Sequence, residues 1–203
     1  MARTRPGLTR DAILAAALSL IDESGIESCT MRAVATELGV EAMSLYWHVP
    51  GKEALLDGIV GRILGEVAAE RDEAGEWQER LASFGHSFRN VLLRHPNALP
   101  LIAGRPFSAY AAAGRMAETG MATLAAAGFD RTTAIRAVRT VSRFVIGFTL
   151  LEVGMKDPTP PPVPDAPALN EILESVSSDD PTELFTFGLD TLVDGLEVRL
   201  RRG

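Results

Sequence analysis

The chain has 203 residues, of which 46% are apolar, a single cysteine and a net charge of −7. This length is enough for one small and one larger domain, or for a single fused core. The lone Cys29 excludes an internal disulfide and a multi-cysteine metal site, which is typical of a reducing cytoplasm, and we expect this thiol to be buried.

The negative net charge argues against DNA binding, because lysine and arginine supply much of the affinity for phosphates. The distribution of charge is more favourable. Residues 1–10 contain three arginines and no acid, and residues 42–52 contain one lysine and no acid. We expect residues 1–8 to form a flexible arm, in which Arg3 and Arg5 either reach the DNA or have no role.

The first two expected helices have recognisable ends. A helix begins after Thr9, whose hydroxyl suits an N-cap, and stops at Gly25. The segment Thr30–His48 then has the pattern of a helix-turn-helix. Its first helix starts at a second N-cap, Thr30, and Gly39 permits the left-handed turn that follows.

The second helix of this motif is expected over Ala42–His48. Val40 and Leu45 are placed to face the first helix, which leaves the remaining side chains outside: Ala42, Met43, Ser44, Tyr46, Trp47 and His48. Such a run suits a DNA major groove. We expect base contacts from Arg32, Ala42, Met43 and Ser44, and phosphate contacts from Tyr46, His48 and Lys52. The alternative is an ordinary helical hairpin in which Tyr46 and Trp47 simply pack.

The segment Leu38–Ile59, LGVEAMSLYWHVPGKEALLDGI, resembles the signature of the tetracycline-repressor family of bacterial transcriptional regulators. The similarity extends to Trp77-Gln78, Ser87-Phe88-Arg89, Gly104-Arg105-Pro106, Phe187-Gly188-Leu189 and Gly195-Leu196-Glu197. The resemblance implies an all-α fold, with three N-terminal helices carrying the helix-turn-helix and a larger helical domain for ligand binding and dimerisation. We place the DNA-binding domain at residues 1–51 and the second domain at residues 52–203.

Apolar residues at helical spacing predict the rest of the chain. We expect helices over Lys52–Arg71, Trp77–Leu93, Ala109–Ala127, Arg131–Met155, Leu169–Val176 and Pro181–Arg201, and a bend over Leu99–Pro106. Asp130 is a candidate cap for the helix that follows it. The segment Asp157–Ala168 contains six of the twelve prolines and is expected to be an extended, mobile loop.

The helices Arg131–Met155 and Pro181–Arg201 are apolar over more than one face, so each can bury one side outside its own chain. The resemblance implies that both contribute to a homodimer, which would read a near-palindromic DNA operator. The alternative is a thick monomeric core. The best apolar span, Phe144–Val153, is short and contains Glu152, so we expect no membrane partner and a cytoplasmic protein.

Apolar residues from several helices are candidates for one effector pocket. The expected lining is Phe84, Phe88, Leu92, Leu101, Ile102, Met121, Leu124, Phe144 and Phe148, with Arg105 and Glu152 as polar contacts. A filled core is the alternative. The resemblance implies histidines that help to hold a magnesium–drug chelate, but this chain has Ala68 and the Leu101-Ile102 pair at those places. We therefore expect a more apolar effector than tetracycline, and no resident metal or cofactor.

Catalysis is disfavoured by the motifs and by the histidines. The chain has no glycine-rich phosphate loop, no Gly-x-Ser-x-Gly elbow and no clustered metal motif. His86 and His95 are nine residues apart, on opposite sides of a helix if both are helical. We expect a one-component repressor that a small effector releases from its operator. The alternative is a helix-turn-helix architectural or adaptor protein without effector control.

Overall fold

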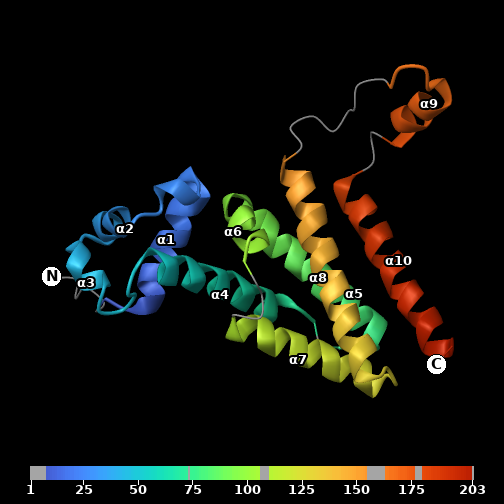
Figure 1. Cartoon of the computed structure of the whole chain (residues 1–203), viewed down its shortest axis with the longest axis horizontal. Helices are drawn as coiled ribbons and strands as arrows, with labels where there is room; N and C mark the ends of the chain where they lie inside the picture. Colours follow the sequence, from blue (N-terminus) through green and yellow to red (C-terminus); the bar gives the residue numbers. More distant parts are fainter. Residues whose placement is uncertain (1–7, 73, 106–109, 155–162, 177–179, 203) are drawn as a thin grey trace. The chain divides into compact units, whose positions relative to one another are not determined.

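The computed structural model describes residues 8–72, 74–105, 110–154, 163–176 and 180–202. Within these ranges the chain is helical and contains no strand, so the all-α prediction is confirmed (Figure 1). The α-helices are α1 (Arg10–Ser24), α2 (Met31–Leu38), α3 (Ala42–Leu45), α4 (Lys52–Glu70), α5 (Trp77–Arg94), α6 (Leu99–Ala103), α7 (Ala111–Ala126), α8 (Arg131–Gly154), α9 (Pro167–Val176) and α10 (Pro181–Arg202). Two 3₁₀ turns, η1 (Ile26–Ser28) and η2 (Pro96–Ala98), join them. No described helix is long and apolar enough to cross a membrane.

The chain divides into two compact units. The first contains residues 1–71 and 90–119, and the second contains residues 72–89 and 120–203. This division differs from a simple cut after residue 51, because α4, η2 and α6 belong with the N-terminal helices. The boundary of a functional DNA-binding domain at residue 51 stays a prediction.

The first unit is organised around α1, which contacts α2, α4, η1 and η2. The Thr9 hydroxyl accepts a hydrogen bond from the Ala12 amide at 3.1 Å, and Gly25, with φ of 80°, follows the helix. Both predicted ends of α1 are therefore confirmed. Gly58 of α4 makes close packing possible, because a Cβ there would lie 2.5 Å from a methyl group of Leu14. Cys29 is buried, as expected, and this burial raises the pKa of its thiol.

The second unit contains α8 and α10, which lie side by side and run antiparallel (Figure 1). The Asp130 carboxylate caps α8 by accepting hydrogen bonds from the amides of Thr132 and Thr133, as predicted. Hydrogen bonds from Thr133 hold the pKa of Asp130 below its usual value. Gly188 of α10 makes room for an aromatic ring, since a Cβ there would lie 2.6 Å from Phe144.

Three details differ from the sequence expectations. The segment after Gly39 is helical only over Ala42–Leu45, and turns continue to His48. The expected bend Leu99–Pro106 contains the helix α6, and α9 begins at Pro167, inside the expected loop. The prolines in these two helices lie in their first turns, where no amide hydrogen bond is lost. The basic arm before Leu8 and residues 157–162 of the expected loop lie outside the described residues.

Candidate nucleic-acid interface and effector region

The corner of the helix-turn-helix is built from local hydrogen bonds. The Thr30 hydroxyl accepts from the Ala33 amide at 3.1 Å and so caps α2. Gly39 is left-handed, with φ of 65° and ψ of 35°, and the Val40 amide donates to the Ala35 carbonyl at 3.0 Å. This arrangement ends α2 and reverses the chain before α3.

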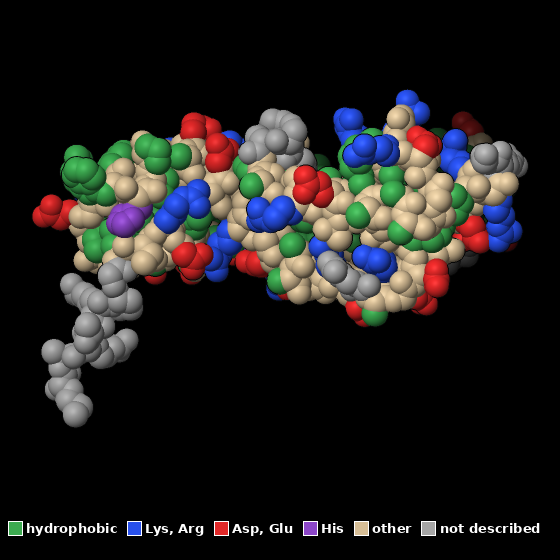
Figure 2. Space-filling model, turned by 90° about the horizontal axis from the view of Figure 1, so that it is seen from below, with side chains coloured by type: hydrophobic (Ala, Val, Ile, Leu, Met, Phe, Trp, Pro, Cys, Tyr) green, Lys and Arg blue, Asp and Glu red, His purple; other side chains and the backbone are tan. Residues whose placement is uncertain are grey.

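The outward side of Ala42–His48, which comprises α3 and the turn after it, is unusually apolar for a surface. Leu45 is completely buried, whereas Met43, Tyr46 and Trp47 are 71%, 45% and 89% exposed. Figure 2 shows hydrophobic side chains and a histidine on the surface over the N-terminal helices. One buried anchor thus holds a short segment whose aromatic side chains stand in solvent. The expectation that these side chains point outward is confirmed, and the packed hairpin alternative is not.

The other predicted DNA contacts lie in α2, in α3, in the turn after α3 and at the start of α4. Arg32, His48 and Lys52 are exposed, and Ala42 and Ser44 are half-buried. Val40, which was expected to face the first helix of the motif, is also half-buried. Lys52 is the first residue of α4, where unpaired amides favour a negatively charged partner. The individual base and phosphate contacts stay predictions.

Next to Lys52, two acids of α4 are held by a later segment of the first unit. The Arg105 guanidinium donates to Glu53 at 2.8 Å and also to Asp57, and the Tyr110 hydroxyl donates to Asp57 at 3.0 Å. The hydrogen bond to Glu53 raises the pKa of Arg105, and burial raises the pKa of Tyr110. The positive charge of Arg105 compensates part of the negative charge that Glu53 and Asp57 place beside Lys52.

The eleven residues of the predicted effector pocket are divided between the two units. Leu92, Leu101, Ile102 and Arg105 belong to the first unit, and the other seven belong to the second. Phe88, Leu92, Leu101, Ile102 and Leu124 are buried, whereas Phe84, Arg105, Met121, Phe144, Phe148 and Glu152 are half-buried. Arg105 and Glu152, the two predicted polar contacts, already have partners within the chain.

In the second unit two predicted pocket residues, Phe144 and Phe148, lie against Phe185, which sequence reasoning did not place there. The rings of Phe144 and Phe148 lie 5.4 and 5.3 Å from the Phe185 ring, and the Phe84 and Phe88 rings are 5.8 Å apart. The Arg89 guanidinium lies 5.1 Å above the Phe185 ring. These contacts form a well-packed aromatic cluster.

Glu152 is bound by Arg89 through two hydrogen bonds, of 2.9 and 2.5 Å. The Arg89 side chain is 5% exposed and the Glu152 side chain is 17% exposed, so this ion pair is largely withdrawn from water. An effector that used Glu152 would have to share its carboxylate with Arg89. Glu152 and the other ten residues remain a predicted effector set.

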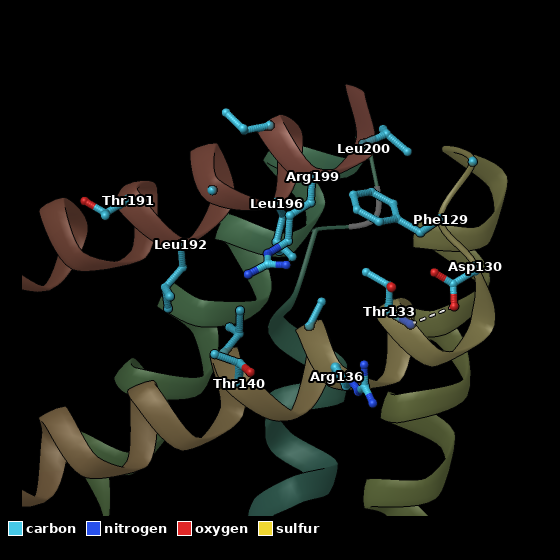
Figure 3. Close-up of a pocket in the computed structure, with 15 residues that line it drawn as sticks. Phe129, Asp130, Thr133, Arg136, Thr140, Thr191, Leu192, Leu196, Arg199 and Leu200 are labelled. Carbon is cyan, nitrogen blue, oxygen red and sulfur yellow. Dashed lines mark hydrogen bonds between the residues drawn. The ribbon is translucent and has the colours of Figure 1, made fainter. Parts of the chain in front are cut away.

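A groove of about 1130 Å³ lies elsewhere in the second unit, between the first half of α8 and the second half of α10. Figure 3 shows Thr140, Leu192 and Leu196 between the two helices, with Arg136 on α8 and Arg199 on α10. None of the eleven predicted effector residues lines this groove.

Comparison with known proteins identifies both parts of the chain. Residues 13–59 match the model of bacterial regulatory proteins of the tetR family, and residues 70–200 match the tetracyclin repressor-like C-terminal domain. The chain belongs to the TetR family. This result confirms the resemblance and explains why α1–α3 precede a larger helical region.

Two curated TetR-family relatives differ in how much of their length is matched. The chain is 35% identical to the tetracycline repressor protein class D of Escherichia coli over 204 residues, covering 95% of this chain and 91% of the relative. It is 40% identical to an HTH-type transcriptional regulator of Saccharopolyspora erythraea over 145 residues. That match covers 71% of this chain, which spans only 61% of the length of the relative.

Solved TetR-family structures share the fold. TetR from Acinetobacter baumannii AYE has a TM-score of 0.78 and 34% identity, covering 96% of this chain and 98% of the other. ActR of Streptomyces coelicolor in complex with actinorhodin has a TM-score of 0.80 and 25% identity, covering 96% and 99%. TetR-family proteins thus span both domains of this chain.

His86 and His95 belong to different units of this TetR-family chain. His86 lies against the Phe185 ring of the second unit, at 5.4 Å, and His95 lies between Asp22 and Glu66 in the first unit. Over the described residues, no three His, Cys, Asp or Glu side chains are grouped to hold a metal ion. Ala68 is exposed and Leu101 and Ile102 are buried, and none of these three side chains contains a nitrogen ligand.

Proposed function

We propose that this TetR-family chain is a homodimeric transcriptional repressor that binds operator DNA and is released by a small, largely apolar effector. The observation that carries the proposal is the exposed face of Met43, Tyr46 and Trp47 around the buried anchor Leu45. Exposed apolar side chains do not contribute to the stability of a helical domain, and a cluster of them marks an interaction site. A DNA groove gives them a partner.

The residues divide by role. Arg32, Ala42, Met43 and Ser44 contact base edges, whereas Tyr46, Trp47, His48 and Lys52 lie against the sugar-phosphate backbone. Arg105 supports this surface indirectly, because it holds the acids Glu53 and Asp57 beside Lys52. Base contacts determine which sequence is preferred, and phosphate contacts determine how tightly any sequence is bound.

Exposed apolar side chains on α8 and α10 support the homodimer. They are Leu150, Leu151 and Val153 on α8, and Leu184, Phe187 and Val198 on α10. Phe187, Thr191, Gly195 and Val198 follow at helical spacing, and the last three of them line the groove between the helices. A second copy covers this stripe, and two-fold symmetry then presents two α3 segments to successive major grooves of a near-palindromic operator.

The effector binds among those apolar residues of the predicted pocket that belong to the second unit, and it changes the separation of the two α3 segments. ActR binds actinorhodin in its crystal structure, which supports an organic ligand for a protein of this fold. A coupling of about 1 to 3 kcal/mol between effector and DNA is enough for a useful switch.

The two kinds of DNA contact are separated by a pair of substitutions on exposed side chains. Lys52→Ala is expected to weaken binding to all duplexes alike and to reduce the slope of log affinity against log salt by about 1, because one phosphate contact is lost. Met43→Gln is expected to change which operator is preferred. Fluorescence anisotropy with a set of operator variants measures both, and equal effects of Met43→Gln on every sequence would overturn its assignment to base contacts.

Tetracycline with magnesium is expected not to release the operator at concentrations typical for tetracycline repressors, because the chain lacks the chelating histidines. Apolar compounds are expected to lower operator affinity and to raise the thermal midpoint of the DNA-free protein. Release by tetracycline would contradict the apolar effector. A broad apolar ligand set that shifts neither quantity would favour the adaptor alternative.

A further inference from the structure

His95 lies between two carboxylates from different helices of the first unit. Its Nδ1 is 2.8 Å from an oxygen of Asp22, near the end of α1, and its Nε2 is 3.2 Å from an oxygen of Glu66, in α4. The side chain is 13% exposed. One imidazole ring therefore joins α1 and α4 to the start of η2. We call this group the His95 clamp.

Glu66, one of the two carboxylates of the His95 clamp, also has cationic neighbours other than His95. Glu66 also faces Arg94 at 3.5 Å and Arg62 at 3.9 Å. Arg94 pairs further with Glu70, and Arg62 pairs with Asp11 at 2.7 Å. Glu66 therefore keeps two cationic neighbours when His95 is neutral.

Asp22 has fewer alternatives. Its second carboxylate oxygen, Oδ1, is buried and has no hydrogen-bond partner in the described part of the chain. The Asn97 side-chain amide donates to the Asp22 main-chain carbonyl at 2.8 Å, not to the carboxylate. In the described part of the chain, the Asp22 carboxylate is therefore held by its ion pair with His95.

The chemistry of imidazole makes this arrangement dependent on protonation. The imidazolium cation has two N–H donors and can donate to Asp22 and Glu66 together, whereas neutral imidazole has one. Histidine is also the side chain that ordinarily changes charge in the physiological pH range. A neutral ring that donates its single N–H to Asp22, whose other carboxylate oxygen has no described partner, turns a bare nitrogen toward Glu66. The link from η2 to α4 is then weakened.

We propose that His95 is a positioning residue that clamps α1 and α4 to η2, and that imidazolium, with two N–H donors for Asp22 and Glu66, clamps them better than neutral imidazole, so that operator affinity is lower at pH 8.5 than at pH 6.0. The proposal rests on the proposed function. Helix α1 contacts α2 of the helix-turn-helix, and α4 begins at Lys52, a predicted phosphate contact. Helix α6 begins at Leu99, four residues after His95, and contains Leu101 and Ile102 of the predicted effector set. A looser clamp lowers the fraction of molecules that hold α3 in the binding arrangement.

The test compares the wild-type chain, His95→Gln and the matched control His86→Gln at pH 6.0, 7.0 and 8.5 at constant ionic strength. From pH 6.0 to pH 8.5, the affinity of the wild type for its operator is expected to fall by roughly tenfold more than its affinity for non-specific DNA. A fall of this size corresponds to the loss of one hydrogen bond to a charged group. His95→Gln is expected to lose this excess pH dependence, and His86→Gln to keep it. Equal pH profiles for the wild type and His95→Gln would overturn the proposal.

A second measurement needs no DNA. Hydrogen exchange in α4, corrected for the intrinsic effect of pH, is expected to show less protection at pH 8.5 than at pH 6.0 in the wild type and no such difference in His95→Gln. Glu66→Gln, at a partly exposed position, provides a second variant if His95→Gln does not fold. A wild type that binds no DNA but shows the exchange effect would refute the proposed function and keep the clamp. Unchanged exchange would refute the clamp.

Discussion

Replacement of Arg89 by alanine is expected to lower the free energy of unfolding by about 3 to 5 kcal/mol, because it leaves the largely buried carboxylate of Glu152 without its partner. Arg89 makes two hydrogen bonds to Glu152 and lies above the Phe185 ring, so the substitution also removes packing from the aromatic cluster. Urea denaturation followed by circular dichroism measures the change.

Two controls separate the buried charge from the loss of side-chain volume. Arg201→Ala breaks an exposed ion pair with Glu197 and is expected to cost less than about 1 kcal/mol. The double variant Arg89→Met with Glu152→Met removes both charges and is expected to recover most of the stability, since apolar replacements of buried ion pairs are often neutral. A cost for Arg89→Ala as small as that for Arg201→Ala would contradict a buried, energetically important pair.

Substitution of Phe187 by aspartate is expected to convert the proposed homodimer to a monomer and to weaken operator binding by roughly 100-fold or more, because the two proposed half-sites are then no longer bound by one linked pair. Phe187 is 71% exposed on α10, so the charge meets water in the monomer and a partner surface in the dimer. Sedimentation velocity at micromolar concentration measures the assembly, and anisotropy measures the affinity.

The matched control for Phe187→Asp is Ala122→Asp, which places the same charge on an exposed position of α7. This control is expected to remain dimeric and to bind the operator as the wild type does. Circular dichroism checks that both variants keep their helices. A Phe187→Asp protein that still sediments as a dimer would move the interface away from this stripe of α10.

Local chemistry made much of the fold predictable from the sequence. Thr9 and Thr30 predict helix starts, because each hydroxyl accepts a hydrogen bond from the amide three residues later. Gly39 predicts the turn, because glycine adopts positive φ without strain. The exposure of Trp47 followed from the helical period on either side of Leu45. Each of these signals is contained within a few residues.

Long-range pairing was not predictable in the same way. Arg89 meets Glu152, Arg105 meets Asp57 and His95 meets Asp22 across 63, 48 and 73 residues of sequence. No spacing rule joins such positions, because they come together only when helices pack. Residues that looked like free polar contacts of a pocket, such as Arg105 and Glu152, are for this reason already paired within the chain.

The role of prolines was also misjudged where position within a helix mattered more than composition. Pro100 and Pro167 suggested a bend and a loop, yet each lies in the first turn of a helix. A proline there loses no hydrogen bond and its fixed φ suits the helix. Composition alone does not distinguish this position from a break.

Oxidative footprinting tests most directly the claim that the exposed side chains of Met43, in α3, and Trp47, just after it, enter a duplex groove. The chain is exposed to hydroxyl radicals with and without a duplex selected from a random pool, and oxidation of Met43 and Trp47 is measured by mass spectrometry. We predict that both side chains react readily in the free protein and are protected by the selected duplex, whose sequence is a near-palindrome. Unchanged oxidation of Met43 and Trp47 in the DNA-bound protein would contradict the claim.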